Sequence, residues 1–201
     1  MVQIDIALQG GGAHGAFSWG VLDRLLEEEG LEIVGVSGTS AGAMNAVALV
    51  QGLATGGPER ARELLETYWL TVSDAARFGP IQRSPFDRLL GRWSLETAPS
   101  FVLSQFISRT VSPYQFNPCD INPLRDIVRK CFDFAAINAA DTPRLFLSAT
   151  NVRTGRPKVF RQPDLSVETV MASACLPFLF RAVEIDGEAY WDGGYMGNPP
   201  L

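Results

Sequence analysis

The segment that most restricts the fold is Gly38-Thr39-Ser40-Ala41-Gly42, which separates an apolar run from a series of small and apolar residues. The run predicts a strand over Glu32–Ser37, and the spacing of the residues from Ala43 to Val50 predicts a helix. A serine between such elements lies on a sharp turn with its hydroxyl exposed at the end of the strand. The flanking Gly38 and Gly42 let that turn close without a Cβ clash. The pattern therefore predicts an elbow at Ser40, with a helix N-terminus behind it that favours developing negative charge.

The histidine count restricts the chemistry of this serine. The chain contains a single histidine, His14, and it precedes Ser40. In α/β-hydrolases the catalytic histidine follows the serine, so this chain does not supply that triad. If Ser40 is a nucleophile, another group must accept its proton, and a carboxylate is the leading candidate.

Asp192 is the candidate base, because it follows a predicted strand and precedes Gly193 and Gly194, which permit a close approach between loops. A carboxylate with an ordinary pKa of about 3.9 is a weak base near neutral pH. Asp192 would therefore need direct contact with the Ser40 hydroxyl, a desolvated pocket, or both. The alternative is that Asp-Gly-Gly forms an ordinary turn.

A second glycine-rich segment, Gly10-Gly11-Gly12-Ala13-His14-Gly15, follows a predicted strand and precedes a predicted helix. Consecutive glycines allow successive backbone N–H groups to point into one concavity, which suits the stabilisation of an oxyanion. The spacing also matches the dinucleotide-binding fingerprint, but the end of the second predicted strand lacks the acidic residue that this fingerprint requires. For His14 we prefer a supporting role in this loop over that of general base.

The order of predicted elements favours an α/β fold with a parallel central sheet. Strands are expected over Ile4–Leu8, Glu32–Ser37, Arg144–Thr150, Lys158–Arg161, Phe180–Ile185 and Glu188–Trp191. Helices are expected over Ala16–Glu29 with Gly30 as its C-cap, Ala41–Ala54, Pro58 to about Val72, Pro123–Cys131 and Val167–Ala174. Between 73 and 140 the pattern weakens, and the segment carries Phe78, Phe86, Trp93, Phe101, Phe106, Tyr114 and Phe116.

Composition limits the classes of partner. A length of 201 residues suits one domain, and a net charge of −5 argues against a general nucleic-acid binder. Cys119, Cys131 and Cys175 form neither a metal-binding pattern nor a closed disulfide framework, which favours reduced thiols. The start of the chain lacks a secretory signal and no apolar stretch reaches spanning length, so we expect a cytoplasmic protein. Peripheral membrane contact and export without a cleavable signal remain compatible with the sequence.

Taken together, the segments 10–15, 38–42 and 192–194 resemble those of the patatin-like phospholipases. The resemblance extends in family order over essentially the whole chain. Weaker matches are Ala149-Thr150-Asn151 with Thr154-Gly155, Ala172-Ser173 with Pro177, and Asn198-Pro199. His14 stands where family members often carry Arg or Lys. Since the family domain usually continues further than Leu201, the resemblance also implies a domain that lacks its C-terminal part.

This resemblance implies a three-layer α/β/α fold and a Ser–Asp dyad in place of a triad. Ser40 would be acylated by a lipid ester, Asp192 would accept its proton, and the glycine loop (Gly10, Gly11, Gly12 and Ala13) would form the oxyanion hole. His14, Gly15, Gly38, Gly42, Gly193 and Gly194 would support these groups. The dyad needs no metal or cofactor, and the aromatic-rich segment would either cover the site or pack in the core.

Two other hypotheses remain open at this stage. The same dyad suits an ordinary soluble carboxylesterase or thioesterase, which would differ in its preference for acyl chain length. A catalytically silent binding module could also keep this fold. Neither the oligomeric state, the lipid head group nor the choice between water and another acyl acceptor follows from the sequence.

Overall fold

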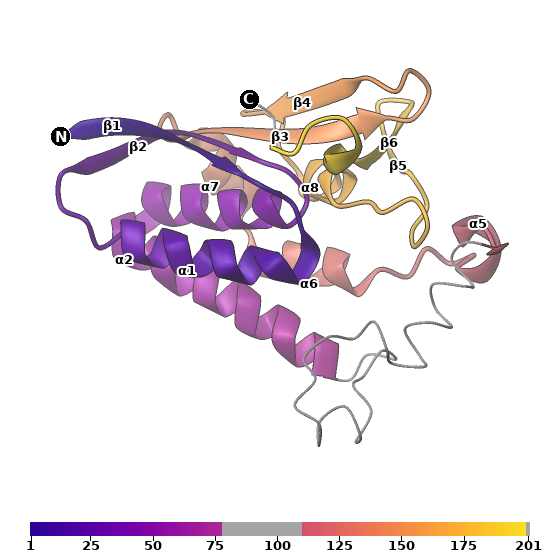
Figure 1. Cartoon of the computed structure of the whole chain (residues 1–201), viewed down its shortest axis with the longest axis horizontal. Coiled ribbons are helices and arrows are strands. Elements are labelled where there is room, and N and C mark those ends of the chain that lie inside the picture. The colour runs from indigo at the N-terminus through magenta and orange to yellow at the C-terminus, as the bar shows by residue number, and fades with distance from the viewer. Residues whose placement is uncertain (78–109, 200–201) are drawn as a thin grey trace.

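The computed structural model describes residues 1–77 and 110–199, and this part of the chain forms a six-stranded sheet with helices packed against it (Figure 1). The strands are β1 (Val2–Leu8), β2 (Leu31–Gly38), β3 (Arg144–Asn151), β4 (Pro157–Arg161), β5 (Val183–Ile185) and β6 (Glu188–Asp192). The helices are α1 (Gly15–Leu25), α2 (Ala41–Arg77), α5 (Pro113–Phe116), α6 (Pro123–Cys131), α7 (Phe134–Ala139) and α8 (Val167–Ser173). Short 3₁₀ turns η1 (Gly12–His14) and η2 (Gly193–Tyr195) complete the described elements.

The three longest strands, β1, β2 and β3, are neighbours in the sheet and run parallel. β1 pairs with β2 from Val2↔Leu31 to Leu8↔Gly38, and β2 pairs with the first half of β3. The shorter strands β4 and β6 pair antiparallel with β3, and β5 pairs antiparallel with β6. This arrangement confirms the expected α/β fold with a mainly parallel sheet, and it brings the C-terminal ends of β1 and β2 to one edge.

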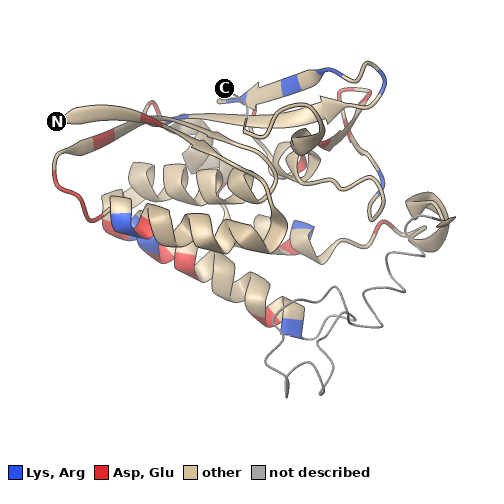
Figure 2. Ribbon diagram, in the orientation of Figure 1, with Lys and Arg blue, Asp and Glu red and all other residues tan. Residues whose placement is uncertain are grey.

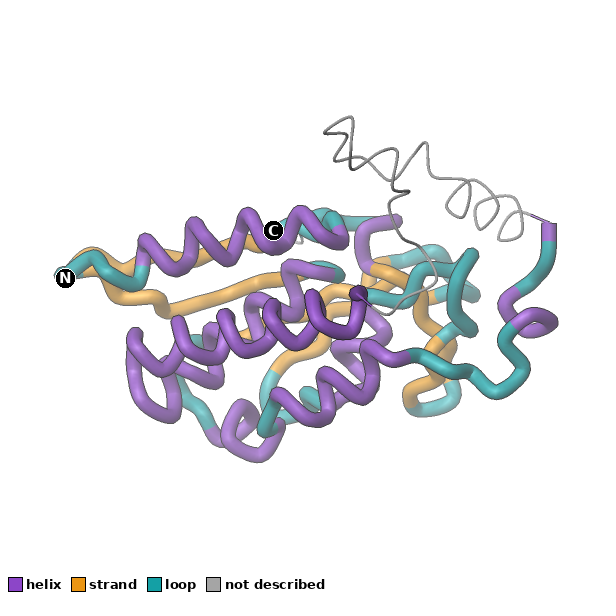
Figure 3. The backbone as a smooth tube through the Cα atoms, turned by 90° about the horizontal axis from the view of Figure 1, so that it is seen from below, coloured by secondary structure: helices purple, strands orange, loops and turns teal. Residues whose placement is uncertain are grey.

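The core lies between the sheet and the helices. Leu8, Val36, Leu145 and Leu147 are buried on the strands, and every residue of α2 from Ala41 to Gly52 is buried. A helix that is buried all round needs neighbours on all sides, and Figure 1 shows this first half of α2 between the sheet and the second half of the same helix. Figure 3, seen from below, shows the helices covering this face of the sheet. Of the three layers expected, the described residues form the sheet and this helical layer.

A break inside α2 was expected near Pro58, and the structure has it at Gly57, whose φ of 77° lies in the left-handed region. The two halves of the helix then fold against each other, and a Cβ added to Gly52 would lie 2.1 Å from the Cα of Ala61. The second half continues to Arg77, beyond the expected end near Val72.

Two other boundaries differ from the prediction by three or more residues. Helix α1 ends at Leu25, not Glu29, and Gly30 lies in the following turn, because Glu27–Glu29 put three negative charges at the negative end of the helix dipole. Strand β5 begins at Val183, not Phe180, because the N–H groups of Leu179 and Phe180 donate to the carbonyl of Leu176 and form a turn there.

Part of the aromatic-rich segment lies outside the described residues, namely Phe78, Phe86, Trp93, Phe101 and Phe106. The remaining two, Tyr114 and Phe116, belong to α5 and are exposed. None of the described helices is long and apolar enough to cross a membrane.

Candidate active site

The turn between β2 and α2 has the geometry of an elbow. Ser40 adopts a φ of 54°, an uncommon conformation for a residue with a side chain, and its N–H donates to Oγ of Ser173 at 3.0 Å. A Cβ on Gly42 would lie 2.2 Å from the carbonyl oxygen of Leu8, and one on Gly38 would lie 2.6 Å from the carbonyl oxygen of Gly42. Both glycines of the motif are therefore required by close backbone approach.

Asp192 lies at the end of β6, opposite Ala149 of β3. Its backbone is held on two sides, because its N–H donates to the carbonyl of Cys175 at 2.8 Å and its carbonyl accepts from Thr150 Oγ1 at 2.9 Å. The carboxylate accepts a hydrogen bond from the N–H of Gly194 at 2.7 Å, and the side chain of Ser40 lies close enough to lower the pKa of Asp192. The structure thus brings together two residues that are 152 positions apart in the sequence.

The environment of Asp192 makes its carboxylate a stronger base than a solvated one. The side chain is 4% exposed, and this burial raises the pKa of Asp192 above its usual value. The hydrogen bonds from Gly194 and Ser40 act in the opposite direction, but burial is the larger effect. A raised pKa favours proton uptake from the Ser40 hydroxyl that already contacts this group.

The glycine loop lies directly beside the elbow. A Cβ on Gly10 would lie 2.8 Å from the Cβ of Ser40, so the loop comes this close only because residue 10 is glycine. The N–H of Gly10 donates to Oδ1 of Asn198 at 2.6 Å, which leaves Gly11, Gly12 and Ala13 as the candidate oxyanion donors. Gly12 and Ala13 begin the short helical turn η1, where N–H groups have no partner within the helix.

His14 is exposed and its ring Nδ1 forms a hydrogen bond with the carbonyl oxygen of Gly11 at 3.0 Å. The N–H of the same residue donates to the same carbonyl at 3.2 Å. These two contacts close the glycine loop on itself. The position of His14 is consistent with the supporting role that the sequence favours.

Gly15 connects the loop to the core. A Cβ there would lie 2.8 Å from the Cβ of Ala41 and 2.8 Å from the ring of Trp69. Its carbonyl accepts from Nδ2 of Asn45 at 2.9 Å, and Oδ1 of that buried asparagine accepts from Nε1 of Trp69 at 2.8 Å. The polar groups behind the loop are therefore paired, as buried groups must be.

A cavity of about 640 Å³ opens beside Ser40. Gly12 and Ala13 of the glycine loop and Ser40 of the elbow provide polar groups to its wall. The rest of the wall is largely apolar and is formed by Trp19, Met44, Tyr68, Trp69, Leu70, Val72, Leu124, Leu176 and Phe180, among others. A cavity of this size with a few convergent polar groups suits a small apolar ligand or a segment of a larger one.

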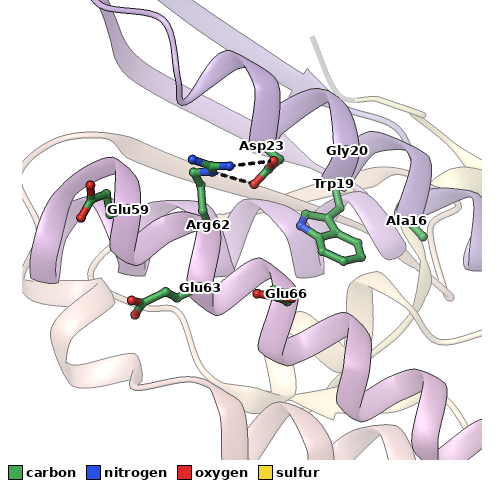
Figure 4. Close-up of a pocket in the computed structure, with 8 residues that line it drawn as sticks. All are labelled: Ala16, Trp19, Gly20, Asp23, Glu59, Arg62, Glu63 and Glu66. Carbon is green, nitrogen blue, oxygen red and sulfur yellow. Dashed lines mark hydrogen bonds and ion pairs between the residues drawn. The ribbon is translucent and has the colours of Figure 1, made fainter.

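A second hollow, of about 620 Å³, lies between α1 and the second half of α2 (Figure 4). Ala16 and Trp19 line both this hollow and the cavity beside Ser40. Asp23 accepts two hydrogen bonds from Arg62, at 2.8 and 3.1 Å, and the guanidinium holds the pKa of that carboxyl below its usual value. These bonds tie α1 to α2 behind the glycine loop.

Residues that fix the site but received no role from the sequence are Ser173, Asn198 and Ser148. Ser173 accepts from the Ser40 N–H, and Asn198 accepts from the Gly10 N–H. Ser148 forms a hydrogen bond of 2.7 Å with Thr39, and its carbonyl would be 2.4 Å from a Cβ on Gly193. Ser173 and Asn198 belong to the weaker matches to the family pattern, and these matches were the one sequence signal for them. Their contacts join distant parts of the chain, which local sequence patterns do not predict.

Among the residues that the structure describes, no cluster of His, Cys, Asp and Glu side chains could hold a metal ion. The three cysteines are free thiols. Burial raises the pKa of Cys175 to about 12, so this thiol stays protonated and serves as a donor to the carbonyl of Arg181.

Comparison with known proteins identifies the family. Residues 6–201 match the family described as patatin-like phospholipase, and the chain belongs to this family. It is 31% identical over 199 residues to lysophospholipase NTE1 from two strains of Cryptococcus neoformans var. neoformans serotype D, JEC21 and B-3501A. The match covers 99% of this chain but 10% of those relatives.

The fold also resembles that of VipD from Legionella pneumophila, known from a crystal structure. The TM-score is 0.50 at 18% identity, and the match covers 99% of this chain and 47% of VipD. At this identity the likeness concerns the fold alone.

Proposed function

We propose that the protein hydrolyses carboxylic esters of lipids, as a phospholipase A or lysophospholipase, through a Ser40–Asp192 dyad. The observation that carries this proposal is the close approach of the Ser40 side chain to the buried Asp192 carboxylate, whose pKa it lowers. The family and the name of the Cryptococcus relatives, lysophospholipase, support a lipid ester as the substrate.

In the first half of the reaction, Ser40 Oγ attacks the ester carbonyl carbon and its proton passes to Asp192. The negative charge that develops on the carbonyl oxygen is stabilised by backbone N–H groups of Gly11, Gly12 and Ala13. The positive end of α2, which begins at Ala41, favours the same charge. Collapse of this intermediate leaves an acyl group on Ser40, and the departing alcohol takes the proton from Asp192.

In the second half, Asp192 accepts a proton from water, and the resulting hydroxide attacks the acyl-enzyme. The bond to Ser40 Oγ breaks, the fatty acid leaves, and the proton returns to Ser40. One carboxylate thus acts twice as base and twice as acid, which favours a pKa closer to neutrality than that of a solvated aspartate. The burial of Asp192 provides such a shift.

The cavity beside Ser40 supports a lipid as the proposed substrate. Its apolar wall would bind the acyl chain and exclude water from it, at about 0.8 kcal/mol for each CH₂ group buried. The ester carbonyl would then lie between Ser40 and the N–H groups of Gly12 and Ala13, all of which line the same cavity.

The test uses a fluorophosphonate probe and intact-protein mass spectrometry. We expect one adduct, lost in Ser40→Ala but kept in Ser18→Ala, a serine of α1 outside the cavity lining. Asp192→Asn should slow labelling by about 10²–10⁴-fold. The matched control Asp186→Asn, in the exposed turn between β5 and β6, should leave the rate unchanged.

Hydrolysis is then measured with lysophosphatidylcholine, phosphatidylcholine and a soluble short-chain ester. Release of fatty acid from the lipids that requires both Ser40 and Asp192 would support the proposal. A labelling rate that is unchanged in Asp192→Asn would refute the dyad. A folded protein without an adduct would instead favour a silent binding module.

A further inference from the structure

The loop between α8 and β5 exposes a group of large apolar side chains. Leu176, Phe178 and Leu179 are 43%, 56% and 40% exposed, and they lie within four consecutive positions. Buried neighbours hold the loop in place, because Cys175 Sγ donates to the carbonyl of Arg181 and the N–H groups of Leu179 and Phe180 donate to Leu176. A fixed loop with its apolar side chains in solvent marks an interaction site more often than a packing defect.

This exposed loop is continuous with the cavity beside Ser40. Leu176 contributes both to the exposed group and to the cavity wall, and Phe180 at the other end of the loop also lines the cavity. A ligand that enters between these side chains would pass directly from a surface in contact with the loop to Ser40.

The charges of the loop are suited to a phosphate-bearing surface. The segment 174–182 contains one charged residue, Arg181. Its guanidinium lies 5.1 Å from the centre of the Tyr114 ring, and among residues 1–77 and 110–199 it has no carboxylate partner. Its Nε is buried without a partner, and its contact with the Tyr114 carbonyl is long, at 3.5 Å. A guanidinium without a carboxylate partner binds phosphate oxygens strongly.

We propose that Leu176, Phe178 and Leu179 insert into a phospholipid surface, with Arg181 at the level of the lipid phosphates and Tyr114 beside it. Tyrosine and arginine are favoured at this depth because each combines an apolar stem or ring with a polar end. The acyl chain of a lipid would then reach the cavity without crossing water. This inference rests on the proposed function for its purpose, but the docking itself is independent of catalysis.

Insertion of apolar side chains predicts which lipids bind. The chain carries a net charge of −5, and many of its charges lie on α1 and the second half of α2, away from this loop (Figure 2). Vesicles of phosphatidylcholine should therefore bind at least as well as vesicles that also contain phosphatidylserine. Raising the salt from about 0.05 M to about 0.5 M should change the affinity little, since insertion does not depend on long-range attraction.

The experiment measures co-sedimentation with phosphatidylcholine vesicles in the Ser40→Ala background, in which no lipid is hydrolysed. We expect binding by this background, and at least about tenfold weaker binding by Phe178→Ser/Leu179→Ser, since each side chain loses most of its transfer into the lipid. Arg181→Gln should weaken binding by a smaller factor. The matched control Phe17→Ser/Val159→Ser, which removes two other exposed apolar side chains, should bind like the background.

The outcomes are distinct. Absence of binding by the background, equal binding by Phe178→Ser/Leu179→Ser, or an equal loss in the control pair would each overturn the proposal. Self-association of the background that disappears in Phe178→Ser/Leu179→Ser, without vesicle binding, would assign the loop to a second copy of the chain. With Ser40 present, the loop variant should keep its hydrolysis of a soluble ester, which shows that it folds. If no form hydrolyses any ester, the proposed function fails while vesicle binding still decides the docking.

Discussion

Trp69 donates a hydrogen bond from its indole Nε1 to Oδ1 of Asn45 at 2.8 Å, and Nδ2 of the same asparagine donates to the carbonyl of Gly15 at 2.9 Å. One buried amide therefore links both halves of α2 to the first residue of α1. Since Gly15 follows the glycine loop directly, this link fixes the far end of the loop that lies beside Ser40.

Replacing Asn45 should destabilise the protein because it breaks two buried hydrogen bonds. Asn45→Ala leaves the Trp69 N–H buried without a partner and removes the side-chain donor to the Gly15 carbonyl, and we expect the free energy of unfolding to fall by about 2–4 kcal/mol. Urea denaturation measures this loss. The double variant Asn45→Ala/Trp69→Phe removes the unpaired N–H and should lose less than the sum of the single changes. Strict additivity of the two would contradict the link.

The raised pKa of Asp192 predicts an acidic limb in the rate profile. The labelling rate with a fluorophosphonate should rise with pH as Asp192 loses its proton, with a midpoint above about 3.9, the value of a solvated aspartate. In Asp192→Asn this limb should vanish, because an amide does not titrate. A limb that persists in the variant would assign the proton transfer to another group.

The same shift has a consequence for stability. The pKa of Asp192 is higher in the folded than in the unfolded protein. Its contribution to stability therefore falls as the pH rises from the pKa of the unfolded state through that of the folded state. Asp192→Asn keeps an acceptor for the Gly194 N–H and removes the buried charge. It should therefore melt at the same or a higher temperature than the parent at pH 7, with an advantage that shrinks toward acid pH. A lower melting temperature at pH 7 with a gap independent of pH would argue against a buried charge.

Substitution by alanine should destabilise the protein at Gly42 and stabilise it at Gly20. Gly42→Ala forces a Cβ to 2.2 Å from the Leu8 carbonyl oxygen, and such overpacking should lower the free energy of unfolding by about 1–3 kcal/mol or more. Gly20 lies inside α1 with no atom within 4 Å of an added Cβ, so Gly20→Ala should stabilise by about 0.4–1 kcal/mol. Thermal unfolding of both variants provides the comparison.

Ser173 should affect the rate of the reaction more than substrate binding. Its Oγ, fully buried at the end of α8, accepts from the Ser40 N–H at 3.0 Å and helps hold the positive φ of the elbow. In Ser173→Ala we expect kcat on a soluble ester to fall by about 10- to 100-fold with little change in KM, because a small displacement of the nucleophile has a large effect. The control Ser18→Ala should match the parent. A change confined to KM would show that Ser173 does not position the nucleophile.

The sequence predicted those parts of the site that local pattern encodes. The elbow at Ser40 and the glycine loop follow from strand, turn and helix signals within a few residues, and the break at Gly57 follows from Gly-Gly-Pro. The lack of a downstream histidine favoured a carboxylate as base, the strand and glycines around Asp192 made it the candidate, and the structure places it near Ser40. That proximity could not be derived from spacing, because it depends on β6 pairing with the end of β3.

Other features could not be predicted from local sequence patterns either. The early end of α1 depends on a charge effect at Glu27–Glu29 that competes with a good apolar stripe. The hydrogen bonds of Ser173 and Asn198 join segments more than a hundred residues apart, at separations of 133 and 188 positions. No periodicity or composition signal records such a pairing, so these residues carried no role until the elements were placed in space.

The bond between Gly10 and Asn198 has a temporal consequence. During synthesis the glycine loop leaves the ribosome before Asn198, which lies 188 positions further on and provides the acceptor for the Gly10 N–H. Asp192 follows Ser40 by 152 positions, so under the proposed dyad the nascent chain carries the serine over that interval without its base. The order of the chain would therefore delay the proposed hydrolysis until β6 has paired with β3.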